Sequence, residues 1–178
     1  MIMNERYLRH IQLSEVGSPG QEKIRKSKLL VVGAGGLGCP ALQYLVAAGV
    51  GTIGIMDSDL ISVSNLHRQI IFNEEDLGEN KALCAKKHLQ RLNSEVKINA
   101  FSFDLTHENA KKYFDEYDIV LDGTDNFYTR YLISDQCILS NKVMIYGAVH
   151  KFEGQISVFN YQNGPSYRCL FPIAPKIG

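Results

Sequence analysis

Apolar and polar residues follow two different periods along this chain. Six short apolar runs have the length of β-strands: residues 28–32, 52–56, 96–103, 118–122, 143–148 and 155–160. Four segments between them repeat apolar residues at helical spacing: residues 36–48, 80–92, 108–117 and 127–139. This alternation predicts an α/β fold, in which a Rossmann-like, doubly wound, mainly parallel sheet carries helices on both faces.

Polar residues predict the boundaries of these elements. Residues 1–27 are polar and predict an N-terminal helical arm, which Ser18-Pro19-Gly20 breaks before a short helix over residues 21–26. We expect residues 28–178 to form the α/β domain itself. Within it, residues 58–79 predict a long loop, and Thr106 predicts a helix N-cap.

Composition excludes several classes of function. Lys and Arg together number 19 and so do Asp and Glu, so no bulk positive field attracts DNA or a membrane surface. The first residues are not typical of a signal peptide, and no apolar run has the length of a membrane span. Four widely separated cysteines are too few for a disulfide scaffold, and we expect a reducing, cytoplasmic location.

A glycine-rich turn follows the first apolar run and precedes a helical pattern. In Gly33-Ala-Gly35-Gly-Leu-Gly38, the first glycine permits a tight turn, the second lets a phosphate approach the backbone, and the third permits close packing of helix and strand. Asp57 ends the next apolar run at a spacing suited to a ribose hydroxyl. The pattern predicts nucleotide binding; the alternative is a purely structural turn.

Cationic and acidic residues follow the strands at the same expected edge. Asn65 and Arg68 lie in the long loop, and Lys81 begins the next helix, so together they favour a triphosphate over a dinucleotide. Taken singly, each is a common surface residue. Asp125, after the fourth strand, suits Mg²⁺ held by one carboxylate and several waters. The alternative is that Asp125 or Asn126 caps the following helix.

These features together resemble a known family, the ThiF/MoeB-type adenylyltransferases, which are relatives of the ubiquitin-activating enzymes. The matching segments occur in order along nearly the whole chain: residues 6–11, 33–38, 57–59, 64–69, 78–81, 122–126, 153–155 and 167–170. The resemblance implies ATP-dependent adenylation of the C-terminal glycine carboxylate of a small ubiquitin-like sulfur-carrier protein that ends in Gly-Gly. It also implies a homodimer, and a role in molybdopterin synthesis, thiamine synthesis or tRNA thiolation.

The resemblance also implies a role for each matching residue. Gly33, Gly35 and Gly36 would lie on the phosphates, and Asp57 would bind the ribose. The loop would line the ATP with Ser64, Asn65, Leu66, His67 and Arg68, of which Arg68 contacts phosphate. Lys81 would contact a phosphate, and Asp125 would coordinate Mg²⁺ with Asn126 beside it. Arg9 would contact the phosphates of the nucleotide in the partner subunit. No general base is required, because the attacking carboxylate is already a nucleophile.

The chain departs from the family pattern near its end. Many relatives carry a Cys-x-x-Cys zinc pair where this chain has Ser166-Tyr-Arg-Cys169. Zinc needs about four ligands, so we expect Cys169 to be free or buried rather than a Zn²⁺ ligand. The second pair would follow Gly178, and we expect the ATP-binding adenylation domain, residues 28–178, to be truncated at its C-terminus. We expect Cys39, Cys84 and Cys137, which lie in helical patterns, to be core residues.

Three other functions stay open at this point. A nucleotide-dependent oxidoreductase shares the glycine loop and Asp57, but it does not explain the set of Arg68, Lys81 and Asp125. A non-catalytic subunit could bind a ubiquitin-like partner. A tRNA-modifying cyclase would also adenylate a carboxylate.

Overall fold

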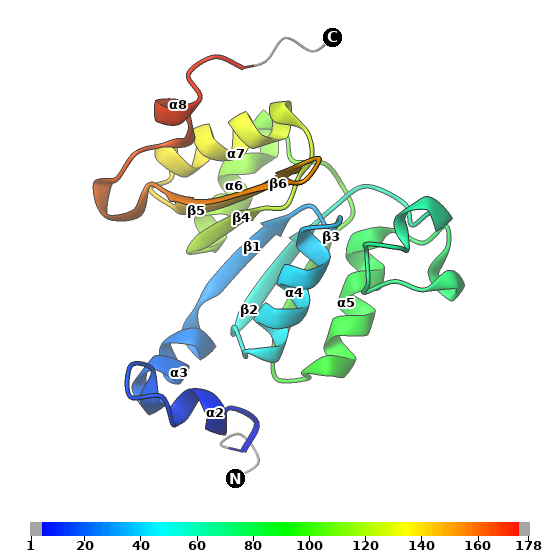
Figure 1. Ribbon diagram of the computed structural model, residues 1–178, viewed down its shortest axis with the longest axis vertical. Coiled ribbons are helices and arrows are strands. Elements are labelled where there is room, and N and C mark those ends of the chain that lie inside the picture. The colour runs from blue at the N-terminus through cyan, green and yellow to red at the C-terminus, as the bar shows by residue number, and fades with distance from the viewer. Residues whose placement is uncertain (1–4, 175–178) are drawn as a thin grey trace.

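The computed structural model describes residues 5–174 and contains one six-stranded sheet (Figure 1). Its strands are β1 (Lys28–Val32), β2 (Thr52–Met56), β3 (Lys97–Phe101), β4 (Ile119–Asp122), β5 (Val143–His150) and β6 (Glu153–Phe159). Their spatial order is β3-β2-β1-β4-β5-β6, and every neighbouring pair is parallel except β5 and β6. This confirms the predicted doubly wound, mainly parallel α/β fold.

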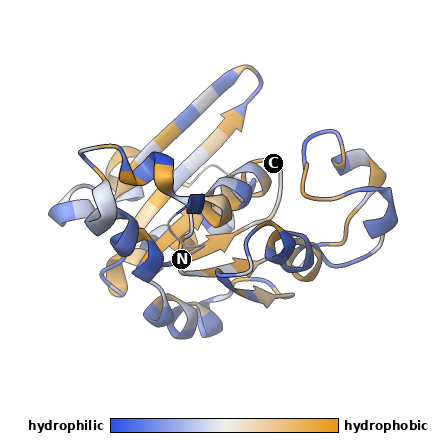
Figure 2. Ribbon diagram, turned by 90° about the horizontal axis from the view of Figure 1, so that it is seen from below, coloured by the Kyte–Doolittle hydropathy of each residue, from blue (hydrophilic) through white to orange (hydrophobic). Residues whose placement is uncertain are grey.

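Helices cover both faces of the sheet. They are α2 (Leu8–Ile11), α3 (Gly17–Lys26), α4 (Gly38–Ala47), α5 (Lys81–Leu92), α6 (His107–Glu116), α7 (Phe127–Leu139) and α8 (Tyr167–Leu170). Successive residues of β1 face opposite apolar clusters: Leu29 packs with α4 and α5, whereas Leu30 packs with α6 and α7. In Figure 2 the ribbon of the central strands is largely orange, whereas the helices alternate between blue and orange along their length.

Polar side chains set the starts of three helices. Asn80, Thr106 and Asn126 each accept a hydrogen bond from a backbone N–H of the first turn of α5, α6 and α7, respectively. The prediction of Thr106 as an N-cap is therefore confirmed. Because Asn126 is the cap of α7, that role does not fall to Asp125.

Glycines fix the contact between β1, α4 and the segment after β4. Gly33 has a φ of +94°, which favours glycine, and a Cβ there would lie 2.7 Å from the carbonyl oxygen of Gly123. A Cβ on Gly38 would lie 1.9 Å from the carbonyl oxygen of Gly33. The first and third glycines of the loop thus serve the tight turn and the close helix–strand packing that the sequence predicted.

The N-terminal segment differs from the prediction in one respect. Residues 18–20 do not break the helix, because they lie in the first turn of α3. Proline is accepted there because its missing N–H would have no intrahelical partner. The segment also packs on its own chain: Tyr7 is buried, its hydroxyl accepts a hydrogen bond from Asn93, and Gln21 donates to the carbonyl of Ala48.

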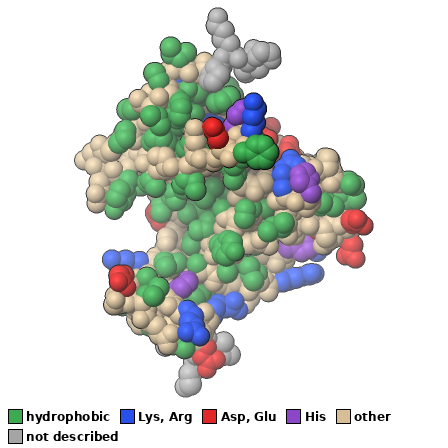
Figure 3. Space-filling view, viewed as in Figure 1, with side chains coloured by type: hydrophobic (Ala, Val, Ile, Leu, Met, Phe, Trp, Pro, Cys, Tyr) green, Lys and Arg blue, Asp and Glu red, His purple; other side chains and the backbone are tan. Residues whose placement is uncertain are grey.

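The hairpin of β5 and β6 leaves apolar side chains exposed at the edge of the sheet. Phe152, Ile156, Val149 and Val158 are all more than half exposed. Hydrophobic side chains gather around β6 and α8 in the upper part of Figure 3. An exposed apolar surface of this kind is typical of a protein–protein contact.

Candidate active site

A cleft of about 1000 Å³ opens at the carboxyl ends of the strands. It lies where the strand order reverses, between β1 and β4, which is where open α/β sheets bind ligands. Most of the site residues proposed from the sequence line it: Gly33, Gly35, Gly36, Asp57, Asn65, Arg68, Lys81, Asp125 and Asn126. Residues from five separate segments of the chain therefore meet in one cleft.

Four of the proposed residues lie outside this cleft lining. Ser64 and His67 are exposed on the loop, and Leu66 packs against the apolar cluster beneath α4 and α5. Arg9 is exposed on α2, near the amino end of β1 and thus at the opposite end of the sheet (Figure 1). Arg9 does not contribute to the cleft of its own chain.

The glycine loop leaves room for a ligand beside its backbone. A Cβ on Gly35 would meet nothing nearer than 3.9 Å, in contrast to the crowded Gly33 and Gly38. A Cβ on Gly36 would approach the Arg68 side chain at 3.3 Å. The loop thus faces open space on the side where the Arg68 guanidinium lies, which is the arrangement that an anionic phosphate needs.

Asp57 is held rigidly at the end of β2. Its two carboxylate oxygens accept hydrogen bonds from the backbone N–H groups of Ala34 and Asp59, at 2.7 and 2.9 Å. Burial raises the pKa of Asp57 above its usual value, and the two N–H donors oppose that rise. Each oxygen keeps a second lone pair for a ligand hydroxyl.

Lys81 is a buried cation at the first position of α5. Its ammonium lies 2.6 Å from a carboxylate oxygen of Asp59, and its side chain is only 6% exposed. Asn80 supports the pair by donating to the carbonyl oxygens of Asp57 and Asp59. An ammonium has three donors, so Lys81 can hold Asp59 and still donate to a phosphate oxygen.

Arg68 is positioned by its own loop. Its guanidinium donates to the carbonyl oxygen of Ser64 and to the side-chain oxygen of Asn65, at 3.1 and 3.0 Å. The loop itself is closed at its base, because Ile61 pairs with Gly78 and Glu79 through backbone hydrogen bonds. These contacts, together with the short 3₁₀ turn η1 (Val63–Asn65), explain how the loop holds the Arg68 charge at a fixed place.

Asp125 is a carboxylate of the cleft whose oxygens are open to a cation. It is exposed, and it makes no hydrogen bond or ion pair with the other residues in the 5–174 range. An unengaged carboxylate on an open rim can give one oxygen to Mg²⁺ while waters supply the other ligands. The donor set therefore fits magnesium.

A buried ion pair at the floor of the cleft was missed by the sequence reasoning. Arg130 on α7 donates to Asp122 at 2.8 Å and to the carbonyl oxygen of Thr124 at 2.8 Å. Asp122 also accepts from the backbone and hydroxyl of Thr124, and its side chain is fully buried. The guanidinium stacks over the ring of Tyr146, with its carbon 4.9 Å from the ring centroid.

One signal could have indicated this pair. Arg130 directly precedes the apolar run of residues 131–133 in α7, and a buried arginine requires a partner. Further residues of the cleft wall that were given no role come from distant segments, among them Phe103, Leu105, Tyr146, Gln155, Tyr167 and Phe171. Their meeting in one wall depends on the tertiary fold, and no local pattern predicts it.

The four cysteines are free, and they differ in environment. Cys39, Cys84 and Cys137 are buried, as predicted, whereas Cys169 is exposed. Cys169 forms no disulfide with the other three cysteines, and it is exposed rather than buried. Burial raises the pKa of Cys39 to about 11 and those of Cys84 and Cys137 to about 12, whereas a hydrogen bond with Ser166 lowers the pKa of Cys169.

We expect one thiol to react rapidly in the native protein and four after denaturation. The thiolate is the reactive form, and only Cys169 is both exposed and free of a raised pKa. Titration with a chromogenic disulfide at neutral pH, with and without denaturant, measures the numbers. The Cys169→Ser variant should lose the rapid phase; persistence of that phase would contradict the assignment.

The strand order, the glycine turn and the cleft at the switch point define a Rossmann-like α/β domain. A family model described as the ThiF family matches residues 7–177, and the chain belongs to that family. The resemblance stated from the sequence motifs is thereby confirmed.

Curated relatives have related names. A "sulfur carrier protein adenylyltransferase" of Thermus thermophilus is 49% identical over an alignment of 179 positions, which covers 98% of this chain and 66% of the relative. A "probable molybdopterin-synthase adenylyltransferase" of Porphyra purpurea is 50% identical over 163 residues, or 92% and 43% of the two chains. An "adenylyltransferase and sulfurtransferase MOCS3" of Anopheles gambiae is 48% identical over 170 residues, or 96% and 38%.

A solved structure shares the fold. The crystal structure of E. coli MccB with MccA-N7isoASN superposes with a TM-score of 0.81 at 26% identity, over 93% of this chain and 50% of that one.

The chain spans between 38% and 66% of the length of the three curated relatives named above. Within residues 5–174, no helix has the length and apolarity needed to cross a membrane.

Proposed function

We propose that this chain uses ATP to adenylate the C-terminal glycine carboxylate of a small ubiquitin-like sulfur-carrier protein. The observation that carries the proposal is the cleft, which places the open glycine loop, Asp57, Arg68, Lys81 and Asp125 together at one edge of the sheet. The names of the relatives support the same reaction class. The pathway that best accords with those names is molybdopterin synthesis.

The proposed nucleotide lies with its ribose on Asp57 and its phosphates over the glycine loop. Asp57 offers fixed acceptor oxygens to the ribose hydroxyls. Gly35 leaves the backbone open to phosphate, and Arg68 and Lys81, which both line the cleft, supply positive charge. Asp125 would hold Mg²⁺, which when bound neutralises part of the phosphate charge.

The chemistry then needs orientation and charge neutralisation rather than a base. A carboxylate oxygen of the carrier attacks the α-phosphorus, the bond to the bridging oxygen breaks, and pyrophosphate leaves with that electron pair. Because the carboxylate is ionised at neutral pH, no proton is transferred. Fixed cations such as Arg68 and Lys81 stabilise the charge that develops on the leaving oxygen.

The proposed active assembly is a homodimer in the cytoplasm. Exposed apolar side chains on the β5–β6 hairpin support a protein contact at that edge. Arg9, which does not reach its own cleft, would serve the nucleotide of the partner subunit. Four free cysteines accord with a reducing location.

Exchange of labelled pyrophosphate into ATP tests the function. We expect exchange that requires both Mg²⁺ and a carrier protein with an intact C-terminal Gly-Gly. Protection against thermal unfolding by NAD but not by ATP would instead indicate the oxidoreductase. Binding of carrier without exchange would indicate a non-catalytic subunit, and exchange with a tRNA-linked carboxylate in place of a carrier would indicate the cyclase.

Asp57→Ala should raise the apparent Kd for ATP by about 10- to 100-fold, the range expected for losing a hydrogen bond to a charged group. The effect on the chemical step should be smaller, because a ribose contact is similar in ground and transition states. ATP titrations of the exchange rate measure both. Asp57→Asn is the control, since it keeps an acceptor for the Ala34 N–H; an unchanged ATP affinity in both variants would refute the ribose role.

Arg9→Ala and Arg68→Ala should each slow exchange, and mixing the two variants should restore about a quarter of the normal activity if subunits reassort randomly into independent sites. Half of the dimers would then be mixed, and in each of them one of the two clefts has an intact Arg68 and receives Arg9 from its neighbour. Subunits that exchange without any recovery of activity would exclude action across the interface.

A further inference from the structure

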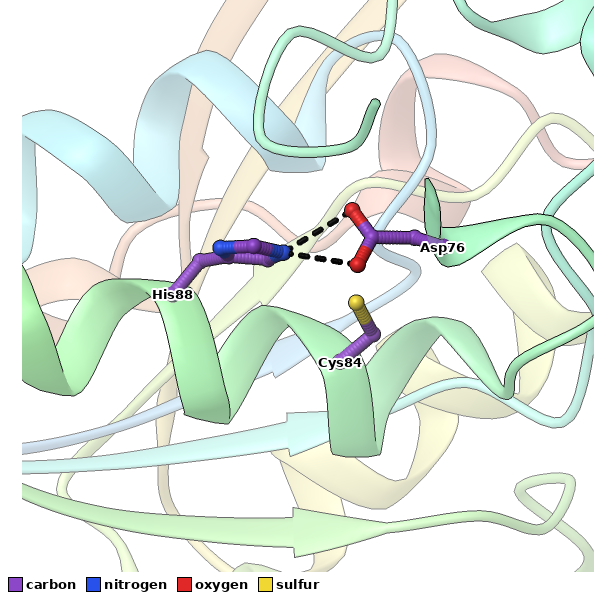
Figure 4. Close-up of side chains that lie close together, drawn as sticks. All are labelled: Asp76, Cys84 and His88. Atoms are coloured by element: carbon purple, nitrogen blue, oxygen red, sulfur yellow. Dashed lines mark hydrogen bonds and ion pairs between the residues drawn. The ribbon is translucent and has the colours of Figure 1, made fainter. Parts of the chain in front are cut away.

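Three potential metal ligands of different chemistry converge away from the cleft. Asp76 lies on the 3₁₀ turn η2 (Glu74–Asp76), and Cys84 and His88 lie on α5, four residues apart and therefore on the same helix face (Figure 4). Their sulfur, nitrogen and oxygen atoms all lie within 4.8 Å of one another. None of the three lines the cleft.

The carboxylate and the imidazole are held in place. The His88 Nε2 lies 2.8 and 3.0 Å from the two carboxylate oxygens of Asp76, so it faces the carboxylate symmetrically. Asp76 is itself fixed by the backbone N–H of Asn73, in the capping box of η2. In Figure 4 the Cys84 sulfur points toward the same carboxylate from the neighbouring turn of α5. Two ligands are thus oriented before any ion binds.

Two of the three groups are shielded from water. Asp76 is 3% exposed and Cys84 is 5% exposed, so both lie largely out of water. The net charge of one carboxylate and one thiolate would balance a divalent cation bound between them.

We propose that Asp76, Cys84 and His88 bind one divalent transition-metal ion of the zinc class, with water as the fourth ligand. Cysteine, histidine and carboxylate are the ligands that zinc prefers. On binding, the Cys84 thiol releases its proton to solvent and the sulfur forms the metal bond. Zinc bonds of the usual length separate tetrahedral ligands by about 3.3–3.6 Å, so the three groups need to move by about an ångström or less from their observed positions.

The proposed ion would link the loop of residues 58–79 to helix α5. Asp76 stands near the end of the loop that carries Asn65 and Arg68, and α5 begins with Lys81. A metal bridge between them would limit movement of this loop relative to Lys81. Hydrogen bonds from His88 and from the Cys84 thiol to Asp76 could do part of this without an ion. A bond between the Cys84 thiolate and the metal, which a hydrogen-bonded cluster lacks, therefore distinguishes a metal site from a simple clamp.

Cobalt(II) spectroscopy tests the site directly. The 178-residue chain, produced without a histidine tag and stripped of metal, is titrated with Co²⁺. We expect one equivalent to produce a thiolate-to-cobalt charge-transfer band and the intense visible bands of tetrahedral cobalt. Stoichiometric Zn²⁺ should abolish them. Zinc at about 100 times its Kd should raise the melting temperature by about 5–10 °C.

Two variants and a matched control decide which thiol is involved. Cys84→Ser should remove the charge-transfer band, and His88→Gln should weaken metal affinity by more than about 100-fold, since even outer-shell changes cost about 10- to 100-fold. Cys169→Ser, which removes the exposed thiol, should leave the band unchanged. Loss of the band in Cys169→Ser would overturn the proposal.

The unsubstituted protein keeps the test decisive if a variant does not fold. Absence of the thiolate band in that protein, or a melting temperature that zinc leaves unchanged, would overturn the proposal by itself. The exchange assay is not needed for any of these readings, so failure of the metal site and failure of the proposed adenylation are separate results.

Discussion

Replacement of Asp125 by alanine is expected to lower carrier-dependent ATP–pyrophosphate exchange by at least about 100-fold. The side chain is exposed at the rim of the cleft and makes no contact that the fold needs among residues 5–174. Its proposed role is to hold Mg²⁺ on the phosphates, which matters most as charge develops on pyrophosphate. The loss should therefore be in catalysis and not in folding.

Exchange assays across a range of Mg²⁺ concentrations, together with thermal unfolding, measure both quantities. Asp115→Ala is the matched control, because Asp115 is an exposed carboxylate on α6 that pairs with Lys111 outside the cleft. It should retain normal exchange. Near-normal exchange by Asp125→Ala would refute its assignment to the metal.

Replacement of Asp122 by alanine is expected to destabilise the fold by about 3–5 kcal/mol, the usual cost of removing one partner from a buried ion pair. The fully buried carboxylate is the partner of Arg130, whose side chain is only 7% exposed. Without Asp122, the guanidinium stays buried with an uncompensated charge. In a chain of this length the melting temperature should fall by roughly 6–20 °C.

An exposed arginine–aspartate pair in the same chain is the control. Arg168 and Asp135 are joined by two hydrogen bonds, but their side chains are 44% and 36% exposed. Asp135→Ala should cost less than about 1 kcal/mol. Replacing Asp122 and Arg130 together with apolar residues should recover part of the lost stability. Equal losses for Asp122→Ala and Asp135→Ala in denaturant unfolding would contradict this account.

The sheet was predictable because burial and strand length leave a clear mark on the sequence. The runs that form β1 and β2 were predicted with the observed bounds, and Thr106 was predicted as a cap. The break at residues 18–20 was wrong because proline and glycine have different consequences in the first turn of a helix than in its interior. Local sequence does not say which of these positions they occupy.

The site was predictable where its residues follow strands. Gly33 and Asp57 directly follow β1 and β2, Asp125 lies three residues after β4, and the carboxyl ends of parallel strands share one edge. The site residues of the loop were harder to predict. Asn65 and Arg68 line the cleft and Ser64 and His67 do not, and this depends on backbone contacts within the loop rather than on a periodic sequence pattern. The pairing of Arg130 with Asp122 depends on how α7 packs against β4.

The mass of the intact carrier protein tests the central claim most directly. The enzyme is mixed with ATP, Mg²⁺ and a ubiquitin-like sulfur carrier that ends in Gly-Gly, and the carrier is analysed by mass spectrometry. We expect its mass to increase by one adenylate group, with release of pyrophosphate, and we expect no increase for a carrier that lacks the terminal glycine or with the Asp125→Ala enzyme. An unmodified carrier in the presence of folded, ATP-binding protein would contradict the proposed adenylation.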